Sequence, residues 1–184
     1  MSIINSMETE DIALNKAYHG IRLIFVARLD SIRQTMKIDI GFGDIIIPAA
    51  QSLSYPVLIR DLPVPDILAY SLETVVAEKF HAMIDLAESN SRMKDFYDVY
   101  ILLKNNEIDN VNLQEAILQT FKRRNTIFTE NHPLFSEDFV KDPSRIFRWK
   151  HFLKKINAPD WEFPHIVKNI LERLQPIYKA MKVE

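Results

Sequence analysis

The first part of the chain alternates hydrophobic and polar residues with the period of two that is typical of β-strands. Residues 20–30 are rich in β-branched and aromatic side chains, and Asp30-Ser31 provides a turn. From residue 32 to residue 42 the alternation is regular. These two segments predict an antiparallel hairpin or meander, with Asp39 on a polar face near a strand end. The opposite face carries Ile32, Gln34, Met36, Ile38, Ile40 and Phe42.

A later segment, residues 71–104, has the period of an α-helix and predicts two helices joined by a polar turn at residues 88–91. Ser71 is suited to cap the first helix, and Glu73 lies in its first turn, where the helix dipole favours a negative charge. The second helix is expected to begin after Asn90 or Ser91, either of which can cap it. The hydrophobic stripes comprise Leu72, Val75, Val76, Phe80, Met83, Leu86 and Ala87 in the first helix, and Met93, Phe96, Val99, Tyr100 and Leu103 in the second.

Three charged residues fall in or beside these hydrophobic stripes. On a helical wheel Lys79 lies in the middle of the first stripe, Arg92 lies within the second, and Asp95 lies at its edge. Because an unpaired buried charge costs several kcal/mol, we expect these three side chains to share one polar pocket between the helices. The alternative is that Arg92 and Asp95 form a routine i,i+3 ion pair while the lysine stem reaches solvent.

Three further charges lie outside the stripes. Glu78 falls on the flank of the first helix, whereas Lys94 and Asp98 fall on the polar side of the second, at the i,i+4 spacing of a surface ion pair.

The remaining chain predicts short strands and further helices. Residues 1–16 are polar and are expected to be loosely ordered or to serve as a linker, and short strands are expected at 55–59 and 67–71. Asn112 is expected to cap a third helix. Asp142-Pro143 predicts the start of another helix. In the last helix, which follows residue 163, Pro176 is expected to cause a kink or a break.

Composition indicates an ordinary globular protein. The chain has 184 residues, 47% of them hydrophobic and 26% charged, with a formal net charge of −2 and no cysteine. This charge argues against a broad nucleic-acid footprint but leaves room for a local basic groove. Three glycines are too few for a glycine-rich phosphate loop. No hydrophobic run is long enough to cross a membrane, and no signal-peptide core is present, so we expect a cytoplasmic protein.

Two motifs in the helical hairpin carry a resemblance. The Glu78-Lys79 pair, followed by the run from Ser91 to Asp98 (SRMKDFYD), resembles the paired C-terminal motifs of the AbiEii/AbiGii-type nucleotidyltransferase toxin family of abortive infection and type IV toxin–antitoxin systems. Residues 37–50 also resemble the second motif of that family. The resemblance covers most of the chain and weakens after about residue 128.

The resemblance implies a fold and a chemistry. The implied fold is α+β, with a nucleotidyltransferase-like, mainly antiparallel mixed sheet in residues 1–70 packed on a helical region in residues 71–184. The implied activity transfers a nucleotidyl group from a nucleoside triphosphate to an RNA or protein acceptor. The implied catalytic residues are Asp39, Lys79 and Asp95, with Asp39 as the ligand of Mg²⁺. The implied nucleotide-binding residues are Glu78, Arg92, Lys94 and Asp98.

The sequence also departs from that family. The Asp-x-Asp motif that holds metal in relatives is absent from these 184 residues, which correspond to the later part of the fold. Either the reading frame is shortened, or the missing segment comes from elsewhere, or the protein no longer catalyses. The alternative function is therefore an inactive nucleotide-binding or protein-interaction module. Because an incomplete sheet exposes an edge and a hydrophobic face, we also expect a homodimer or a partner complex, with a cognate antitoxin as one candidate.

Overall fold

The chain has the α+β fold class expected from its sequence. The computed structural model describes residues 7–15, 18–89 and 91–181. In these residues all strands precede residue 70 and all helices follow residue 71. The chain forms two compact units, Met1–Asp44 and Ile45–Glu184, each of which is considered by itself.

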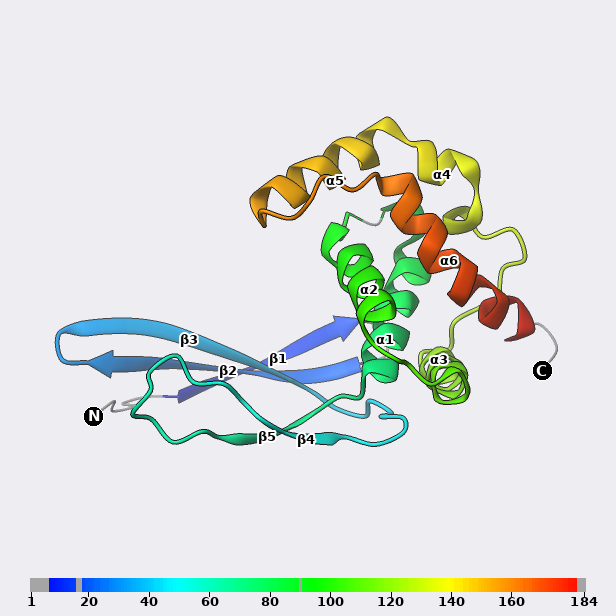
Figure 1. Cartoon of the computed structure of the whole chain (residues 1–184). Coiled ribbons are helices and arrows are strands. Elements are labelled where there is room, and N and C mark those ends of the chain that lie inside the picture. The colour runs from blue at the N-terminus through cyan, green and yellow to red at the C-terminus, as the bar shows by residue number, and fades with distance from the viewer. Residues whose placement is uncertain (1–6, 16–17, 90, 182–184) are drawn as a thin grey trace. The chain divides into compact units, whose positions relative to one another are not determined.

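The N-terminal unit is a three-stranded antiparallel sheet in the order β1-β2-β3 (Figure 1). Strand β2 (Tyr18–Leu29) and strand β3 (Ile32–Gly41) form the expected hairpin, and Asp30 in its turn has a φ of 52°. The register pairs Arg22 with Asp39. Residues on paired positions of antiparallel strands lie on the same face, so this register brings the two side chains together.

Strand β1 (Met7–Asn15) corrects the expectation that residues 1–16 are loosely ordered or a linker, as far as it concerns residues 7–15; residues 1–6 and 16 lie outside the described residues. Its sequence, METEDIALN, is too polar at its start to show a hydrophobic alternation. It nevertheless pairs with β2 from Met7 opposite Phe25 to Asn15 opposite Tyr18. Backbone pairing with a neighbouring strand, rather than local composition, accounts for this strand.

The second unit begins with a small antiparallel hairpin of strands β4 (Gln51–Ser54) and β5 (Asp66–Ala69). The expected strand at residues 67–71 corresponds to β5, but the one at residues 55–59 is wrong. That hydrophobic segment instead belongs to the loop that joins the two strands, where Leu62 N–H donates to the carbonyl of Ile59. Leu58 and Ile59 are exposed there, so burial does not hold the segment in an extended strand.

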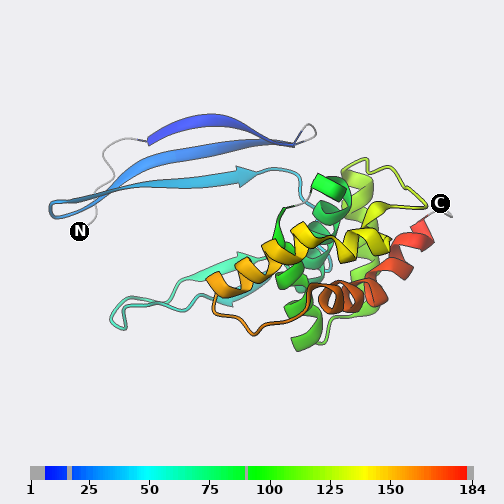
Figure 2. The same cartoon turned by 90° about the horizontal axis from the view of Figure 1, so that it is seen from above.

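The helices gather into one body in both views (Figures 1 and 2). Helix α1 is capped as expected by Ser71, whose Oγ accepts from Thr74 N–H at 3.2 Å. Helix α5 likewise begins at the expected Asp142-Pro143. The helical elements are α1 (Leu72–Leu86), η1 (Ala87–Ser89), α2 (Met93–Asn105), α3 (Asn110–Arg123), η2 (Pro133–Phe135), α4 (Glu137–Lys141), α5 (Pro143–Lys155) and α6 (Phe163–Ala180).

Two helix boundaries differ from expectation. Asp109, rather than Asn112, caps α3, because the Asp109 carboxylate accepts the N–H of Asn112 at 2.8 Å. Helix α6 continues past Pro176 to Ala180 without a break. Its fully buried Leu174 and Tyr178 lie on either side of Pro176, so tertiary packing holds the helix together through the proline.

The core of the second unit lies among these helices. Tyr178 of α6 is nearly fully buried and makes ring contacts with Phe80 of α1 and Phe121 of α3. Trp149 of α5 is fully buried and packs against Phe163. These contacts fix α1 and α5 within one framework, and α2, which carries the second motif, packs against α1, α5 and α6.

Candidate functional site

Lys79 of α1 lies between two carboxylates of α2. Its Nζ is 3.0 Å from Asp95 Oδ1 and 2.8 Å from Asp98 Oδ2. Asp95 and Asp98 are three residues apart, so both project from the same side of α2 toward α1. The side chains of all three residues are largely buried, with exposed fractions of 21% or less. We call Lys79, Asp95 and Asp98, together with Lys94, the Lys79 cluster.

The charges of the Lys79 cluster stabilise one another. Burial disfavours the charged form of Lys79, but hydrogen bonds to Asp98 and Asp95 outweigh it and raise the pKa of Lys79. Burial likewise opposes the charge of Asp98, yet hydrogen bonds from Lys79 and Lys94 lower the pKa of Asp98. Lys79 and Asp98 are therefore both charged at neutral pH.

The structure corrects the helical-wheel placement of Asp98. Asp98 was expected on the polar side of its helix, but it is mostly buried and bonded to Lys79 as well as to the exposed Lys94, whose Nζ lies 2.6 Å from Asp98 Oδ2. Two lysines and two carboxylates make the cluster formally neutral. Positive charge for binding an anion must therefore come from residues beside it.

Arg92 is such a residue, but it does not lie in the helix. It occupies the N-cap position before α2, with φ −82° and ψ 72°, and its side chain makes no capping bond. It is exposed rather than part of a buried stripe. Helix α2 starts at Met93, so Ser91 is not its cap, and Asn90 lies outside the described residues.

A groove runs between the start of α2 and helix α5. It has a volume of about 760 Å³, and Asp95 links it to the Lys79 cluster. One oxygen of Asp95, Oδ2, is buried and has no hydrogen-bond partner among the described residues. We call this the α2–α5 groove; it is lined by Ser91, Arg92, Met93, Lys94 and Asp95 on one side and by Phe147, Arg148, His151, Phe152 and Lys155 on the other.

The α5 side of this groove was missed by sequence reasoning, which considered only the hydrophobic stripe of α5. A signal was present. Residues 143–155 contain five Lys or Arg residues and no Asp or Glu. An amphipathic helix with several basic residues and no acidic residue indicates a surface for anions.

Glu78 faces away from the Lys79 cluster, toward α3. Its carboxylate forms an ion pair with Arg124, which follows the last residue of α3. Both side chains are mostly buried. This pair joins α1 to α3, so Glu78 supports the helix that carries Lys79 rather than the groove.

Asp39 belongs to the N-terminal unit, where it pairs with Arg22. Arg22 Nε and Nη2 lie 2.6 Å and 2.8 Å from the two carboxylate oxygens. The hydrogen bond from Arg22 lowers the pKa of Asp39. Both carboxylate oxygens are thus engaged by a guanidinium.

The described residues do not fit a Mg²⁺ site. Magnesium needs several oxygen ligands in near-octahedral geometry, and Asp39 offers one carboxylate that already binds Arg22. No group of three or more His, Cys, Asp or Glu side chains in the described part of the chain is arranged to hold a metal ion. Asp39 by itself therefore offers Mg²⁺ little advantage over the water ligands that the ion would have to give up.

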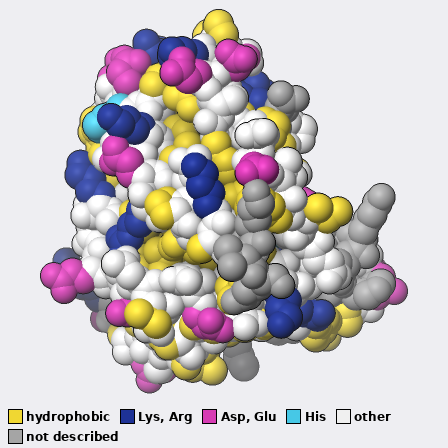
Figure 3. Space-filling model, turned by 90° about the vertical axis from the view of Figure 1, so that its right-hand side faces the viewer, with side chains coloured by type: hydrophobic (Ala, Val, Ile, Leu, Met, Phe, Trp, Pro, Cys, Tyr) yellow, Lys and Arg dark blue, Asp and Glu magenta, His cyan; other side chains and the backbone are white. Residues whose placement is uncertain are grey.

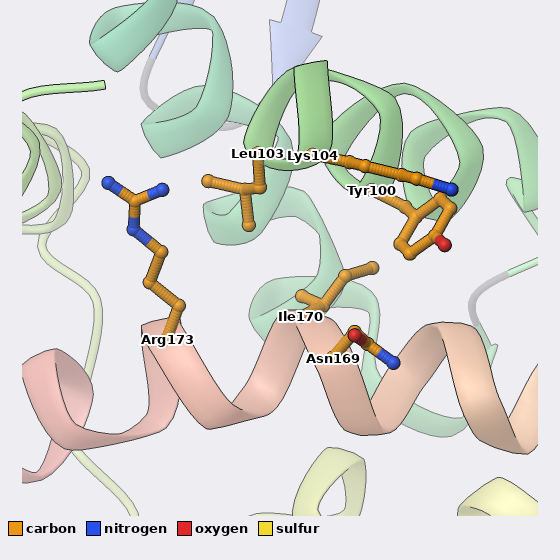
Figure 4. Close-up of a pocket in the computed structure, with 6 residues that line it drawn as sticks. All are labelled: Tyr100, Leu103, Lys104, Asn169, Ile170 and Arg173. Carbon is orange, nitrogen blue, oxygen red and sulfur yellow. The ribbon is translucent and has the colours of Figure 1, made fainter. Parts of the chain in front are cut away.

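A smaller pocket of about 230 Å³ lies at the other end of α2, against α6 (Figure 4). Its cations already have partners. Lys104 Nζ lies over the rings of Tyr100 and Trp161, and Arg173 donates to the carbonyl of Ile108 at 2.6 Å. In Figure 4, Leu103 and Ile170 lie between Arg173 and Lys104. This pocket is a weaker candidate for an anion than the α2–α5 groove.

Most of the chain matches a known protein family. The model of the family described as nucleotidyl transferase AbiEii toxin, type IV TA system, matches residues 2–169. The chain belongs to this AbiEii family. No curated protein matches the chain. Family membership makes the chain a nucleotidyltransferase-like toxin-family protein and suggests a cognate antitoxin as its partner. Among the described residues, no helix is long and hydrophobic enough to span a membrane.

Proposed function

We propose that this AbiEii-family protein binds a nucleoside triphosphate beside the Lys79 cluster, with the phosphates held at the start of α2. The observation that carries the proposal is the position of the cluster. The largely buried Lys79 ammonium is fixed by Asp95 and Asp98, and Asp95 also lines the groove whose rim carries Arg92 and Lys94. Fixed cations beside a cleft attract phosphate more strongly than solvated ones, because water screens them less.

The residues of the proposed site have different roles. Arg92 supplies the positive charge that the neutral cluster lacks, and its guanidinium can bind two phosphate oxygens at once. Lys94, the exposed cation of the cluster, can turn toward the phosphates from its contact with Asp98. Lys79 contacts the phosphate nearest the cluster. Asp95 and Asp98 position Lys79, and Asp95 is also the candidate base for an acceptor hydroxyl. In the transfer, that hydroxyl oxygen would attack the α-phosphorus and pyrophosphate would leave.

The two remaining residues of the family motifs have other roles in this proposal. Glu78 keeps α1 in place through Arg124. Asp39, paired with Arg22, would join the reaction only if that ion pair were exchanged for substrate or metal. The proposal therefore assigns no role to magnesium, and assays should be run both with and without it.

The test is a titration of GTP and ATP into the parent protein and two lysine variants, with and without EDTA. Lys79→Ala should weaken nucleotide binding by about 1.5–3 kcal/mol, the value of a charged hydrogen bond. Lys168→Ala is the matched control, since Lys168 is an exposed lysine of α6 whose contact with Glu172 is a long 3.9 Å. Equal affinities of parent and Lys79→Ala, in a parent that binds, would place the site elsewhere.

A second candidate function is a binding module without catalysis, which contacts a nucleotide or an antitoxin. The pairing of Asp39 with Arg22 and the lack of a metal-ligand cluster among the described residues favour it. Incubation with α-labelled nucleotides and added RNA or protein separates the two candidates. Labelled acceptor supports transfer, whereas nucleotide binding without labelled acceptor supports the module.

A further inference from the structure

The α5 side of the α2–α5 groove has the features of a surface for a polyanion. Arg148, His151 and Lys155 line it and are all exposed. They stand at positions i, i+3 and i+7 of one helix, so they form a single stripe along the groove. Arg92 and Lys94 add cations on the opposite side, although Lys94 is also paired with Asp98. Among the described lining residues the one carboxylate is that of Asp95, which is already bonded to Lys79.

This charge is local. The whole chain has a formal charge of −2, and on the face in Figure 3 basic and acidic side chains are interspersed. A surface on which the two signs of charge are mixed in this way does not attract polyanions in general. Helix α5, in contrast, carries five Lys or Arg residues and no acid. Of these, Arg145 is buried against the ring of Phe139, which leaves four on the surface: Arg148, Lys150, Lys154 and Lys155.

An aromatic side chain lies beside these cations. Phe147 lines the groove with 73% of its surface exposed, although α5 buries its other large rings more deeply. A phenyl ring left in water next to phosphate-binding cations is the combination that proteins use to hold single strands, where bases stack on rings and cations follow the backbone. Stretches of acidic peptide would satisfy the cations but have no flat base to stack on Phe147.

The volume limits what can enter. A groove of about 760 Å³ falls in the range of about 300–1,000 Å³ for sites that enclose one small ligand. It therefore accommodates one or two nucleotides of a single strand, and a duplex would only touch its rim.

We infer that the α2–α5 groove binds a single strand of nucleic acid, with phosphates on Arg148 and Lys155 and a base on Phe147. This inference rests on the proposed function in one respect, because it identifies the strand as the acceptor delivered to the Lys79 cluster. The strand enters along α5 and its end lies toward Asp95, which lines the same groove.

The test is fluorescence anisotropy with short labelled single strands of RNA and of DNA, each with mixed sequence. Arg148→Ala combined with Lys155→Ala should weaken binding at least tenfold. It should also lower the slope of log affinity against log salt by about 1.4, since each lost phosphate contact on a single strand contributes about 0.7. The matched control is Lys150→Ala with Lys154→Ala, which removes the same charge from exposed positions of α5 that do not line the groove. This control should weaken binding less than threefold.

Phe147→Ala tests the stacking contact separately. It should weaken strand binding about tenfold without changing the salt slope, because no charge is removed. Ile127→Ala, which truncates another exposed hydrophobic residue, is its control. All of these side chains are exposed, so thermal unfolding should confirm that each variant folds like the parent.

The inference would be overturned by no binding of either strand, by equal losses in the two charge variants, or by an unchanged affinity in Phe147→Ala. Competition by polyglutamate as effective as by the strand would also overturn it in favour of an acidic peptide. The proposed nucleotide site is tested independently, because Arg148→Ala with Lys155→Ala should leave GTP and ATP affinity unchanged. If the protein binds the strand but no nucleotide, the groove is still a strand-binding site, and only its role as the acceptor site is lost.

Discussion

Lys79 Nζ donates to Asp95 Oδ1 at 3.0 Å and thereby joins α1 to α2. The sequence separation is 16 residues, so only the folded hairpin brings these atoms together. Their exposed fractions, 21% and 12%, place the pair mostly out of water. An ion pair in that environment is costly to break by removing one partner, because the other charge is left without compensation.

Removal of Lys79 should therefore affect stability as well as binding. Lys79→Ala leaves Asp95 and Asp98 facing each other, and we expect the free energy of unfolding to fall by about 2–4 kcal/mol, near the range for breaking a buried pair. Lys94→Ala removes a lysine that is 72% exposed and should cost about 0–1 kcal/mol. Urea unfolding measures both. If both variants lose the same small amount of unfolding free energy, the charges of the Lys79 cluster are effectively solvated, which would contradict this expectation.

A substitution at Glu78 can distinguish a structural role, in holding α1 against α3, from a direct role in nucleotide binding. Glu78→Gln removes the ion pair with Arg124 that connects α1 to α3, and we expect the free energy of unfolding to drop by about 1–3 kcal/mol. Nucleotide affinity of the folded variant should stay within twofold of the parent. A large loss of affinity at unchanged stability would instead make Glu78 a direct nucleotide contact, the role that the family resemblance implies.

Two buried histidines predict a loss of stability in mild acid. Burial, reinforced by the nearby Arg124 cation and opposed by Asp85, lowers the pKa of His81 from 6.5 to about 4, and burial also lowers the pKa of His132. The unfolded chain then binds more protons than the folded chain as pH falls from 6.5 toward 4. Stability should be greatest above pH 6.5 and should decrease across this window, by up to about 1.4 kcal/mol per pH unit from His81. His132 should add a further loss as the pH falls below 6.5.

The variant His81→Gln isolates one of these contributions. Its amide can still bond to Thr126, whose Oγ1 lies 2.7 Å from His81 Nε2. Between pH 4 and 6.5 the unfolding free energy of His81→Gln should depend less steeply on pH than that of the parent. The exposed His151 provides the control, since His151→Gln should keep the parental slope. A parental slope in His81→Gln would refute the assignment.

The N-terminal sheet predicts self-association or a partner. Strand β3 exposes a row of hydrophobic residues, among them Ile32, at 65%, and Ile38, at 47%. Such a row on an edge strand favours coverage by another chain. We expect sedimentation velocity to show a dimer at micromolar concentration, or a complex when the cognate antitoxin is present. Ile38→Lys should shift the protein toward monomer, whereas a monomeric parent at high micromolar concentration would contradict this expectation.

The sequence predicted those features that local patterns determine. Ser71 and Asp142 were recognisable as caps because each precedes a helical run, and the strict alternation from Ile32 onward predicted β3 and its hairpin with β2. The contact between Lys79 and Asp95 was predicted, together with Arg92, because Lys79 lies within a hydrophobic stripe and Asp95 lies at the edge of the next one. These inferences depend on neighbours a few residues away, which a sequence displays directly.

The features that failed depend on distant partners. Strand β1 forms because it pairs with β2. Its sequence, METEDIALN, has no hydrophobic alternation from which a strand could be predicted. Asp98 was expected on the polar side of its helix, but it forms an ion pair with Lys79 of another helix. The groove combines the start of α2 with α5, more than fifty residues later, so only the fold brings Arg92 near Phe147.

The most direct test of the central claim is a comparison of ATP, ADP, AMP and adenosine binding to the parent and to Arg92→Ala with Lys94→Ala. Isothermal titration in EDTA removes any contribution from metal. The account predicts that parental affinity falls with each phosphate removed, and that this difference largely disappears in the variant. Arg92 adds positive charge beside the neutral Lys79 cluster, and Lys94 is the exposed cation of that cluster, so the variant loses both cations proposed to contact the phosphates. Equal binding of ATP and adenosine by the parent, or an unchanged preference for ATP in the variant, would contradict the account.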